Sequence, residues 1–151
     1  MHVSWTFLDK RAAAVNAIRA YKDMEFIIET TPENIKEQKI LMVSPKSAQL
    51  TGTPGMNDPR RGEQRIAAII DEIDISRERY RQALEYVEWF EPAWKELTDT
   101  ERLILTEFYM SATLRSGATK KLEQVLNYGH SQVDRLRSKA LARFSQLLYG
   151  L

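Results

Sequence analysis

The chain has 151 residues, of which 43% are hydrophobic and 28% are charged, and its net charge is +1. Such a chain can bury the core of one or two small domains and still present a strongly charged surface. It contains no cysteine, which excludes a disulfide framework and a cysteine-based metal site. Its start lacks the basic-then-apolar pattern of a signal peptide, and no segment approaches a membrane span. We therefore expect a cytoplasmic protein without membrane contact.

Residues 1–43 are expected to form the N-terminal helices. Apolar residues recur there every seven positions, which predicts a helix over residues 8–29 with an imperfect heptad seam. The seam positions are Phe7, Ala14, Tyr21 and Ile28. Thr31 and Pro32 then suit the cap and the first turn of a second helix, which we expect to end at about residue 43.

Residues 44–61 are the clearest break in the helical pattern. They hold three of the five prolines and two of the six glycines of the chain. Such a stretch cannot propagate a helix, and it is longer than a usual connection. We expect a flexible linker.

Residues 62–91 carry the strongest pattern of a long helix. Apolar positions alternate at spacings of four and three, with one arginine among them. The predicted seam consists of Ile66, Ile70, Ile73, Arg77, Tyr80, Leu84 and Val87. A coiled-coil-like stripe of this kind must pack on the first helix, on a partner chain, or on both. We expect the helix to end or bend near Phe90, because Pro92 follows.

Residues 92–151 are predicted to form a separate C-terminal module. Thr98 and Glu101 have the spacing of a capping box, which predicts a helix over residues 99–110. Ser116 or Thr119 is expected to cap the next helix.

Residues 120–141 predict two short helices joined by a tight turn. Leu122 and Leu126 lie one helical turn apart on the first of them. Asn127 and Gly129 tolerate the left-handed backbone that a sharp turn between helices requires. The apolar residues of the second helix repeat at steps of three and four and share one face. They are Val133, Leu136, Ala140 and Leu141. This spacing predicts a helix-turn-helix, whose second helix can lie in a groove of DNA.

Charge is distributed unevenly along the chain. Residues 111–151 carry seven basic against two acidic residues, whereas residues 62–110 carry twelve acidic against six basic. A basic C-terminal module after an acidic helical segment is typical of small DNA-binding proteins.

Two sets of side chains in this module are candidate DNA contacts. The outward positions of the second helix can reach base edges. They are His130, Ser131, Gln132, Asp134 and Arg135. Among them, Gln132 can hold an adenine with two hydrogen bonds and Arg135 a guanine. Phosphate contacts are expected from Lys120, Lys121, Arg137, Ser138, Lys139 and Arg143.

Residues 97–105 and 122–141 resemble region four of bacterial sigma factors, the module that reads the upstream promoter hexamer. The residues that carry the resemblance are Leu97-Thr98-Asp99-Thr100-Glu101-Arg102-Leu103-Ile104-Leu105, Leu122, Leu126-Asn127-Tyr128-Gly129, Val133, Leu136 and Lys139-Ala140-Leu141. The order of helix, linker, long helix and helix-turn-helix resembles small phage and prophage proteins related to the RinA and ArpU late-gene transcriptional regulators. This resemblance implies activation of late phage genes, with double-stranded DNA and RNA polymerase as partners.

The chain also departs from the sigma pattern. Leu122 and Glu123 stand where that pattern has isoleucine and alanine, and Gly129 stands where it has a serine cap. Of the positions that face the bases, only Arg135 carries a positive charge. We therefore do not expect the promoter hexamer of sigma factors to be the DNA target of this chain.

The sequence thus predicts an all-α protein with a long helical hairpin or coiled-coil stalk followed by a C-terminal helix-turn-helix module. We expect a DNA-binding transcription regulator, and a homo-oligomer if the N-terminal helices pair between chains. No metal, cofactor or catalytic residue is expected, because His2 and His130 lack ligand-spaced partners and no nucleophile motif is present. The alternative is a phage structural or packaging adaptor that uses its helical stalk for contacts with other proteins.

Overall fold

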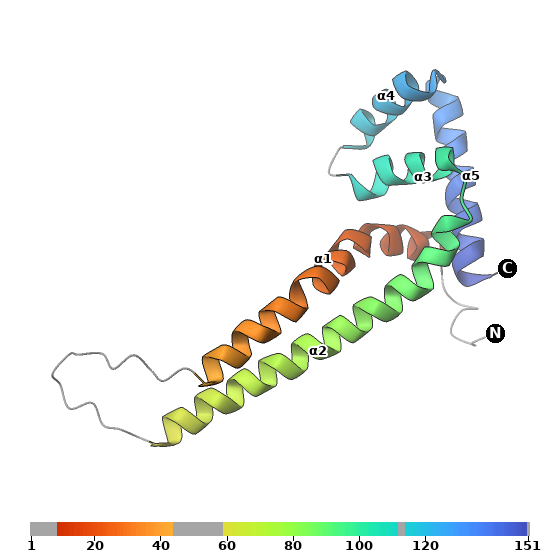
Figure 1. The fold of residues 1–151 in the computed structure, drawn as a ribbon. Coiled ribbons are helices and arrows are strands. Elements are labelled where there is room, and N and C mark those ends of the chain that lie inside the picture. Colours follow the sequence, from red (N-terminus) through yellow and green to blue (C-terminus); the bar gives the residue numbers. More distant parts are fainter. Residues whose placement is uncertain (1–8, 44–58, 112–113, 151) are drawn as a thin grey trace. The chain divides into compact units, whose positions relative to one another are not determined.

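The computed structural model describes residues 9–43, 59–111 and 114–150. These residues form five α-helices and one π-helical turn, and no strand occurs among them (Figure 1). The predicted all-α class is confirmed. No helix of these ranges combines the length and the hydropathy that crossing a membrane requires.

The described residues divide into two compact units. Residues 9–25 and 85–150 form one, here called the core unit, and residues 26–43 and 59–84 form the other, here called the hairpin unit. This division differs from the predicted boundaries at residues 44, 62 and 92, because both long helices contribute to both units.

The first long helix, α1, spans Lys10–Val43 and passes through Pro32 without a break. The predicted second helix with Thr31 as its cap is therefore wrong. An interior proline removes one backbone hydrogen bond and costs roughly 3 kcal/mol. Thr31, directly before the proline, is buried, so tertiary packing contributes to keeping this stretch helical.

The second long helix, α2, spans Pro59–Lys95. It includes the last three residues of the predicted linker, and linker residues 44–58 lie outside the described ranges. The helix continues past Pro92, so the predicted end near Phe90 is wrong. Phe90 and Ala93, on either side of this proline, are buried in the core unit. Their burial offsets the cost of the proline.

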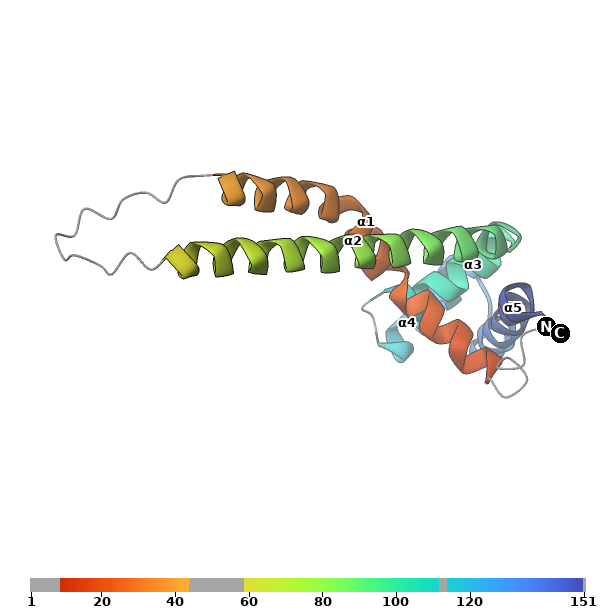
Figure 2. The ribbon, with the colours of Figure 1, turned by 90° about the horizontal axis from the view of Figure 1, so that it is seen from below.

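In the hairpin unit, α1 and α2 run antiparallel and side by side (Figures 1 and 2). Gln38 Nε2 donates a hydrogen bond of 3.1 Å to Glu72 Oε2. Arg65 Nη2 donates one of 2.8 Å to the carbonyl oxygen of Leu41. These bonds tie the far end of α1 to the beginning of α2.

The covered face of α2 in the hairpin unit differs from the predicted seam. Its buried or half-buried positions are Arg65, Ile69, Ile73, Ser76, Tyr80 and Ala83. Ile66, Ile70 and Leu84 of the predicted seam are instead exposed. A single neighbouring helix covers one stripe of α2, and the side on which α1 packs selects that stripe.

The larger hydrophobic core of the core unit is built from the first part of α1, the end of α2, α3 (Asp99–Leu105) and the C-terminal half of α5 (His130–Tyr149). Its buried side chains are Ala14, Ala17, Ile18, Phe90, Ala93, Leu97, Leu105, Ala140, Leu141, Phe144 and Leu148. Phe90 contacts both α1 and α5, because its ring centroid lies 4.9 Å from that of Tyr21 and 5.2 Å from that of Phe144. The C-terminal module therefore shares its core with the beginning of α1.

Helix α3 begins at the predicted capping box. Thr98 Oγ1 accepts a hydrogen bond of 3.2 Å from the Glu101 N–H, and Glu101 Oε2 accepts one of 2.9 Å from the Thr98 N–H. After Leu105 the α-helix changes to a π-helical turn, η2 (Thr106–Met110). The predicted single helix over residues 99–110 therefore changes its hydrogen-bond pattern partway.

Helix α4 (Arg115–Leu126) begins earlier than its predicted caps. Its N-cap is Leu114, which makes no side-chain cap, and both Ser116 and Thr119 lie inside the helix. The helix ends at Asn127, whose φ of 54° and ψ of 44° are left-handed. The sharp turn that the sequence predicts is therefore present.

The inward face of α5 is largely as predicted. Val133, Ala140 and Leu141 are buried, and Leu136 is half-buried. A second, smaller core joins the beginning of α5 to α3 and α4 through the buried residues Ile104, Leu122 and Val133. This small core holds the two helices at the turn together.

We expect Asn127→Ala to lower the free energy of unfolding by about 1 kcal/mol and Asn127→Gly to change it little. A left-handed backbone is costly for residues with a Cβ other than asparagine and aspartate, and glycine adopts it freely. Urea denaturation followed by circular dichroism measures both variants. Equal losses would show that the side chain of Asn127, and not its backbone conformation, matters at this turn.

Candidate nucleic-acid interface

The first two turns of α5 present a polar face. His130, Ser131, Gln132 and Arg135 are exposed there, while Val133 of the same turns is buried. Their side chains make no hydrogen bond or ion pair with any other described residue. The structure therefore brings four of the five predicted base-contacting residues together on one open surface.

Asp134 lies on the same helix, but its carboxylate binds two arginines of the same chain. Its Oδ1 accepts hydrogen bonds of 2.8 Å from Arg137 Nη2 and of 3.3 Å from Arg115 Nη2 on α4. These two guanidinium groups, that of Arg137 above all, hold the pKa of Asp134 below its ordinary value. Asp134 thus ties α4 to α5, and its negative charge is offset by two positive ones.

Arg137 points into the protein and is largely buried, with its side chain 17% exposed. Besides binding Asp134, it donates a hydrogen bond of 3.0 Å from Nη1 to Tyr109 Oη. Its guanidinium carbon lies 5.4 Å from the ring centroid of Phe108. Arg137 therefore anchors α5 to η2, which leaves little of this side chain for a phosphate.

Two other predicted phosphate contacts form ion pairs across helices. Lys121 Nζ lies 2.7 Å from Glu107 Oε1, and Glu107 is buried in η2. Arg143 Nη1 lies 2.7 Å from Glu101 Oε2, and its Nη2 donates a hydrogen bond of 3.0 Å to the Glu96 carbonyl. Both cations remain exposed, so each stabilises the fold and also adds positive charge to the surface.

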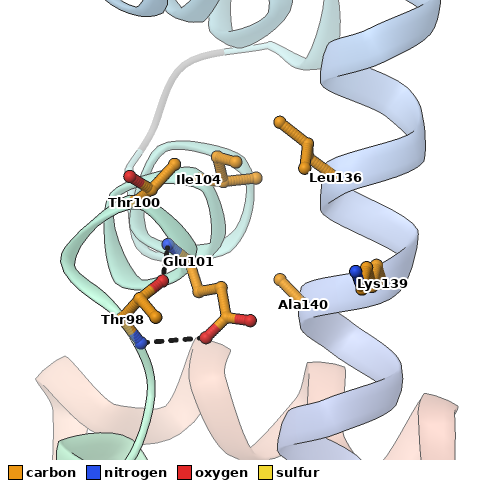
Figure 3. A pocket seen from close by; sticks show the side chains of 7 residues that line it. All are labelled: Thr98, Thr100, Glu101, Ile104, Leu136, Lys139 and Ala140. Carbon is orange, nitrogen blue, oxygen red and sulfur yellow. Dashed lines mark hydrogen bonds between the residues drawn. The ribbon is translucent and has the colours of Figure 1, made fainter.

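Lys120 and Lys139 are exposed, and neither pairs with another described residue. Lys120 lies on α4. Lys139 lies on α5, among the residues that line a small cavity of about 150 Å³ between α3 and α5 (Figure 3). Ser138, the remaining predicted phosphate contact, is half-buried.

The cavity in Figure 3 is lined from two sides, by α3 with the residue before it and by α5. Its lining consists of Thr98, Thr100, Glu101, Ile104, Leu136, Lys139 and Ala140. The α3 side includes the capping box, in which Thr98 and Glu101 already bind each other. We therefore assign it no ligand.

The beginning of α5 also lacks a side-chain cap. Its N-cap, Gly129, provides no side-chain hydrogen bond to the first turn. The first backbone N–H groups of a helix lack partners within it, and together with the helix dipole they attract anions. This end, next to an exposed polar face, therefore has the chemistry to attract an anion such as a phosphate group.

Sequence reasoning missed two exposed apolar residues beside this face. Tyr128 lies in the turn and Val125 on the last turn of α4, and both are exposed. The large side chain of Tyr128, in the tight turn between Asn127 and Gly129, could have indicated this exposed surface. Apolar residues in tight turns are seldom needed for a core. Aromatic and aliphatic groups can contact sugars and the thymine methyl group.

We expect Arg137→Gln to raise the pKa of Asp134 toward its ordinary value, and Arg115→Gln to raise it less. Arg137 is the main cause of the lowered pKa of this carboxyl. Because the pKa is lower in the folded chain, the interactions of the carboxylate stabilise the fold at pH values above its ordinary pKa. They are lost as the pH falls through the lowered pKa. A carboxyl-carbon NMR titration measures the shift. A larger rise in the Arg115 variant would contradict the geometry.

Within the described ranges, no three histidine, aspartate or glutamate side chains gather to hold a metal ion. The groups that do gather are hydrogen-bond donors, cations and an open helix end. Comparison with known proteins assigns no family: no family model matches the chain, and neither a curated protein nor a solved structure matches it.

Proposed function

We propose that this protein is a DNA-binding transcription regulator that places α5 in the major groove of duplex DNA. The observation that carries the proposal is the open polar face of α5, with His130, Ser131, Gln132 and Arg135 exposed and without partners among the described residues. Surface side chains of these types pair with base edges. The left-handed turn at Asn127 and the small core beneath it support the proposal that α4 and α5 form a helix-turn-helix.

Different residues carry different parts of the proposed binding. Gln132 and Arg135 read bases, because an amide and a guanidinium can each form two hydrogen bonds with one purine. Lys120 and Lys139 bind phosphates, because they are exposed and unpaired. Asp134 acts mainly by fixing α4 against α5 through its two arginine partners.

The resemblance to phage late-gene regulators supplies the proposed biological role. A regulator of that kind binds upstream of phage genes and contacts RNA polymerase, which raises transcription. The net positive charge of residues 111–151 supports the DNA part of this role.

The experiment that tests the proposal is selection of bound duplexes from a random-sequence pool, followed by sequencing. We expect one motif to be enriched by the full chain, and weaker enrichment of its central purines by Gln132→Ala. The matched control is Gln146→Ala, an exposed glutamine at the other end of the same helix. Absence of any enriched or bound duplex would overturn the proposal and favour a protein-binding adaptor.

A further inference from the structure

The π-helical turn η2 contacts both helices of the predicted helix-turn-helix. Glu107 Oε1 lies 2.7 Å from Lys121 Nζ on α4. Tyr109 Oη accepts a hydrogen bond of 3.0 Å from Arg137 Nη1 on α5. The residue between them, Phe108, has its ring centroid 5.4 Å from the guanidinium carbon of Arg137. Three consecutive side chains of η2 therefore reach two different helices.

The hydrogen-bond pattern of η2 favours this arrangement. The turn closes with a bond of 3.0 Å from the Ser111 N–H to the Thr106 carbonyl oxygen, five residues earlier. Since a π-helical turn holds more residues than an α-helical one, consecutive side chains are separated by a smaller angle around the axis. Glu107, Phe108 and Tyr109 can therefore all reach the side on which α4 and α5 lie. Turns of this kind occur frequently at functional sites.

The polar contacts of η2 form part of a closed ring over three elements. Tyr109 binds Arg137 of α5, and Arg137 Nη2 donates a hydrogen bond of 2.8 Å to Asp134 of the same helix. Asp134 also accepts one of 3.3 Å from Arg115, the first residue of α4. The ion pair between α4 and η2 closes the ring. Each of the three elements is thus joined to the other two by a polar contact.

The η2 turn is itself held by both hydrophobic cores of the core unit. The ring of Tyr109 packs against the larger core, and the guanidinium carbon of Arg19 on α1 lies 5.9 Å from its centroid. Phe108 packs against the smaller core. The polar groups of η2 therefore have fixed positions from which they can hold α4 and α5.

The buried carboxylate of Glu107 indicates positioning rather than stabilisation. Glu107 is 9% exposed, and its Oε2 is buried without a hydrogen-bond partner among the described residues. Burying a charge with one oxygen unsatisfied is costly, and an apolar residue of similar size is often at least as favourable for stability. An ion pair that contributes little to stability can still determine which of several arrangements two helices adopt.

We infer that η2 sets the angle between α4 and α5, with Glu107 and Tyr109 as its positioning residues. Glu107 holds α4 through Lys121, and Tyr109 holds α5 through Arg137. The consequence for DNA rests on the proposed function: both residues are needed to present α5, although neither touches a base. The angle itself can be measured without DNA.

The test variant combines Glu107→Met with Tyr109→Phe, which removes both polar contacts and nearly keeps the size of both side chains. Because the chain has no cysteine, Ser116→Cys on α4 and Gln146→Cys on α5 can carry two spin labels at exposed positions. Pulsed electron paramagnetic resonance measures the distance between the labels. We expect this distance to shift, or its distribution to widen, by at least about 1 Å, the looseness at which a designed site loses function.

The matched control combines Tyr86→Phe with Glu91→Gln. Tyr86 donates a hydrogen bond to the Ala17 carbonyl, and Glu91 pairs with Lys95, so both contacts lie within α1 and α2. The control is expected to keep the distance distribution of the natural chain. The midpoint of thermal unfolding of the test variant is expected not to fall below that of the control, because the substituted carboxylate was buried and incompletely paired.

Two results of these measurements would overturn the inference. The first is an unchanged distance distribution in the test variant, or the same change in the control, which would show that η2 does not set the angle. The second is a changed distribution together with an unfolding midpoint below that of the control, because the change would then reflect partial unfolding.

Binding of the same variants to the selected duplex, measured by fluorescence anisotropy, tests the consequence for DNA. We expect the affinity of the test variant to fall by about 2–30-fold, the range for residues that act on a site through a packed network. The control is expected to bind as the natural chain does. If the natural chain binds no duplex, the proposed function fails, and the label distances still decide the inference. Intact binding despite a changed angle would show that η2 does not position α5 for DNA.

Discussion

Phe90→Ala is expected to lower the free energy of unfolding by about 3–5 kcal/mol, the largest effect of any single substitution considered for this chain. Phe90 is fully buried, and its ring lies within 5.5 Å of four other aromatic rings. These rings belong to Tyr21, Tyr86, Trp94 and Phe144. They come from α1, α2 and α5, so the cavity left by the substitution opens where three segments of the core unit meet. Since a domain of this size is stable by only about 5–15 kcal/mol, we expect much of the unit to unfold near physiological temperature.

Urea denaturation followed by circular dichroism measures this loss. The matched control is Trp89→Ala, on the neighbouring position of α2. Trp89 packs against Tyr86 and Tyr149 but is partly exposed, so its removal leaves a smaller cavity and is expected to cost less than about 2 kcal/mol. If both variants lose the same stability, Phe90 is not the centre of the core.

Arg135→Ala is expected to weaken binding to the preferred duplex by about 1–3 kcal/mol, which corresponds to about 5–150-fold, and to relax the choice of base at one position. Arg135 is exposed on α5 and pairs with no other described residue. The cost arises because the substitution leaves a guanine O6 and N7 without their donors. Fluorescence anisotropy with the selected duplex and its single-base variants measures both effects.

Lys120→Ala provides the comparison for Arg135→Ala. Lys120 lies on α4, outside the proposed recognition helix α5, and we expect its loss to weaken binding equally for every sequence. If Arg135→Ala also weakens all duplexes equally, Arg135 holds a phosphate and another residue selects the base.

The turn and the capping box were predictable because each depends on a few neighbouring residues. Asn127 adopts the left-handed backbone that its side chain tolerates. Thr98 and Glu101 satisfy each other's backbone N–H groups at the spacing that a first helical turn fixes. The buried face of α5 was predictable for a similar reason, since helical periodicity alone places Val133 and Ala140 together.

The predictions that the helices are interrupted at Pro32 and Pro92 were wrong. The energetic cost of a proline inside a helix is real, but it does not decide alone whether the helix continues. Proline disfavours a continuous helix in isolation. Burial of Thr31 beside Pro32, and of Phe90 and Ala93 beside Pro92, depends on segments far away in the sequence. A rule based on the proline alone cannot include the stabilisation that this burial provides.

The ion-pair partners of the basic residues were likewise not predicted from the sequence. Arg137, Lys121 and Arg143 look alike as basic residues of one module, yet each meets an acidic side chain in the fold. Two of those acidic residues, Glu101 and Glu107, precede α4 and come near these cations only after folding. The sequence therefore indicates which residues carry charge, and the fold decides which of these charges form ion pairs within the chain.

The most direct test of the central claim is the dependence of duplex binding on salt. If Lys120, Lys139 and the two partly paired cations Lys121 and Arg143 contact phosphates, about four counterions are released. The logarithm of the affinity should then fall with a slope of about −3.6 against the logarithm of salt concentration, a loss of about 100-fold between 50 and 200 mM. We expect this slope for the natural chain and a slope nearer zero for the double variant Lys120→Ala with Lys139→Ala. Negligible binding at every salt concentration would contradict it.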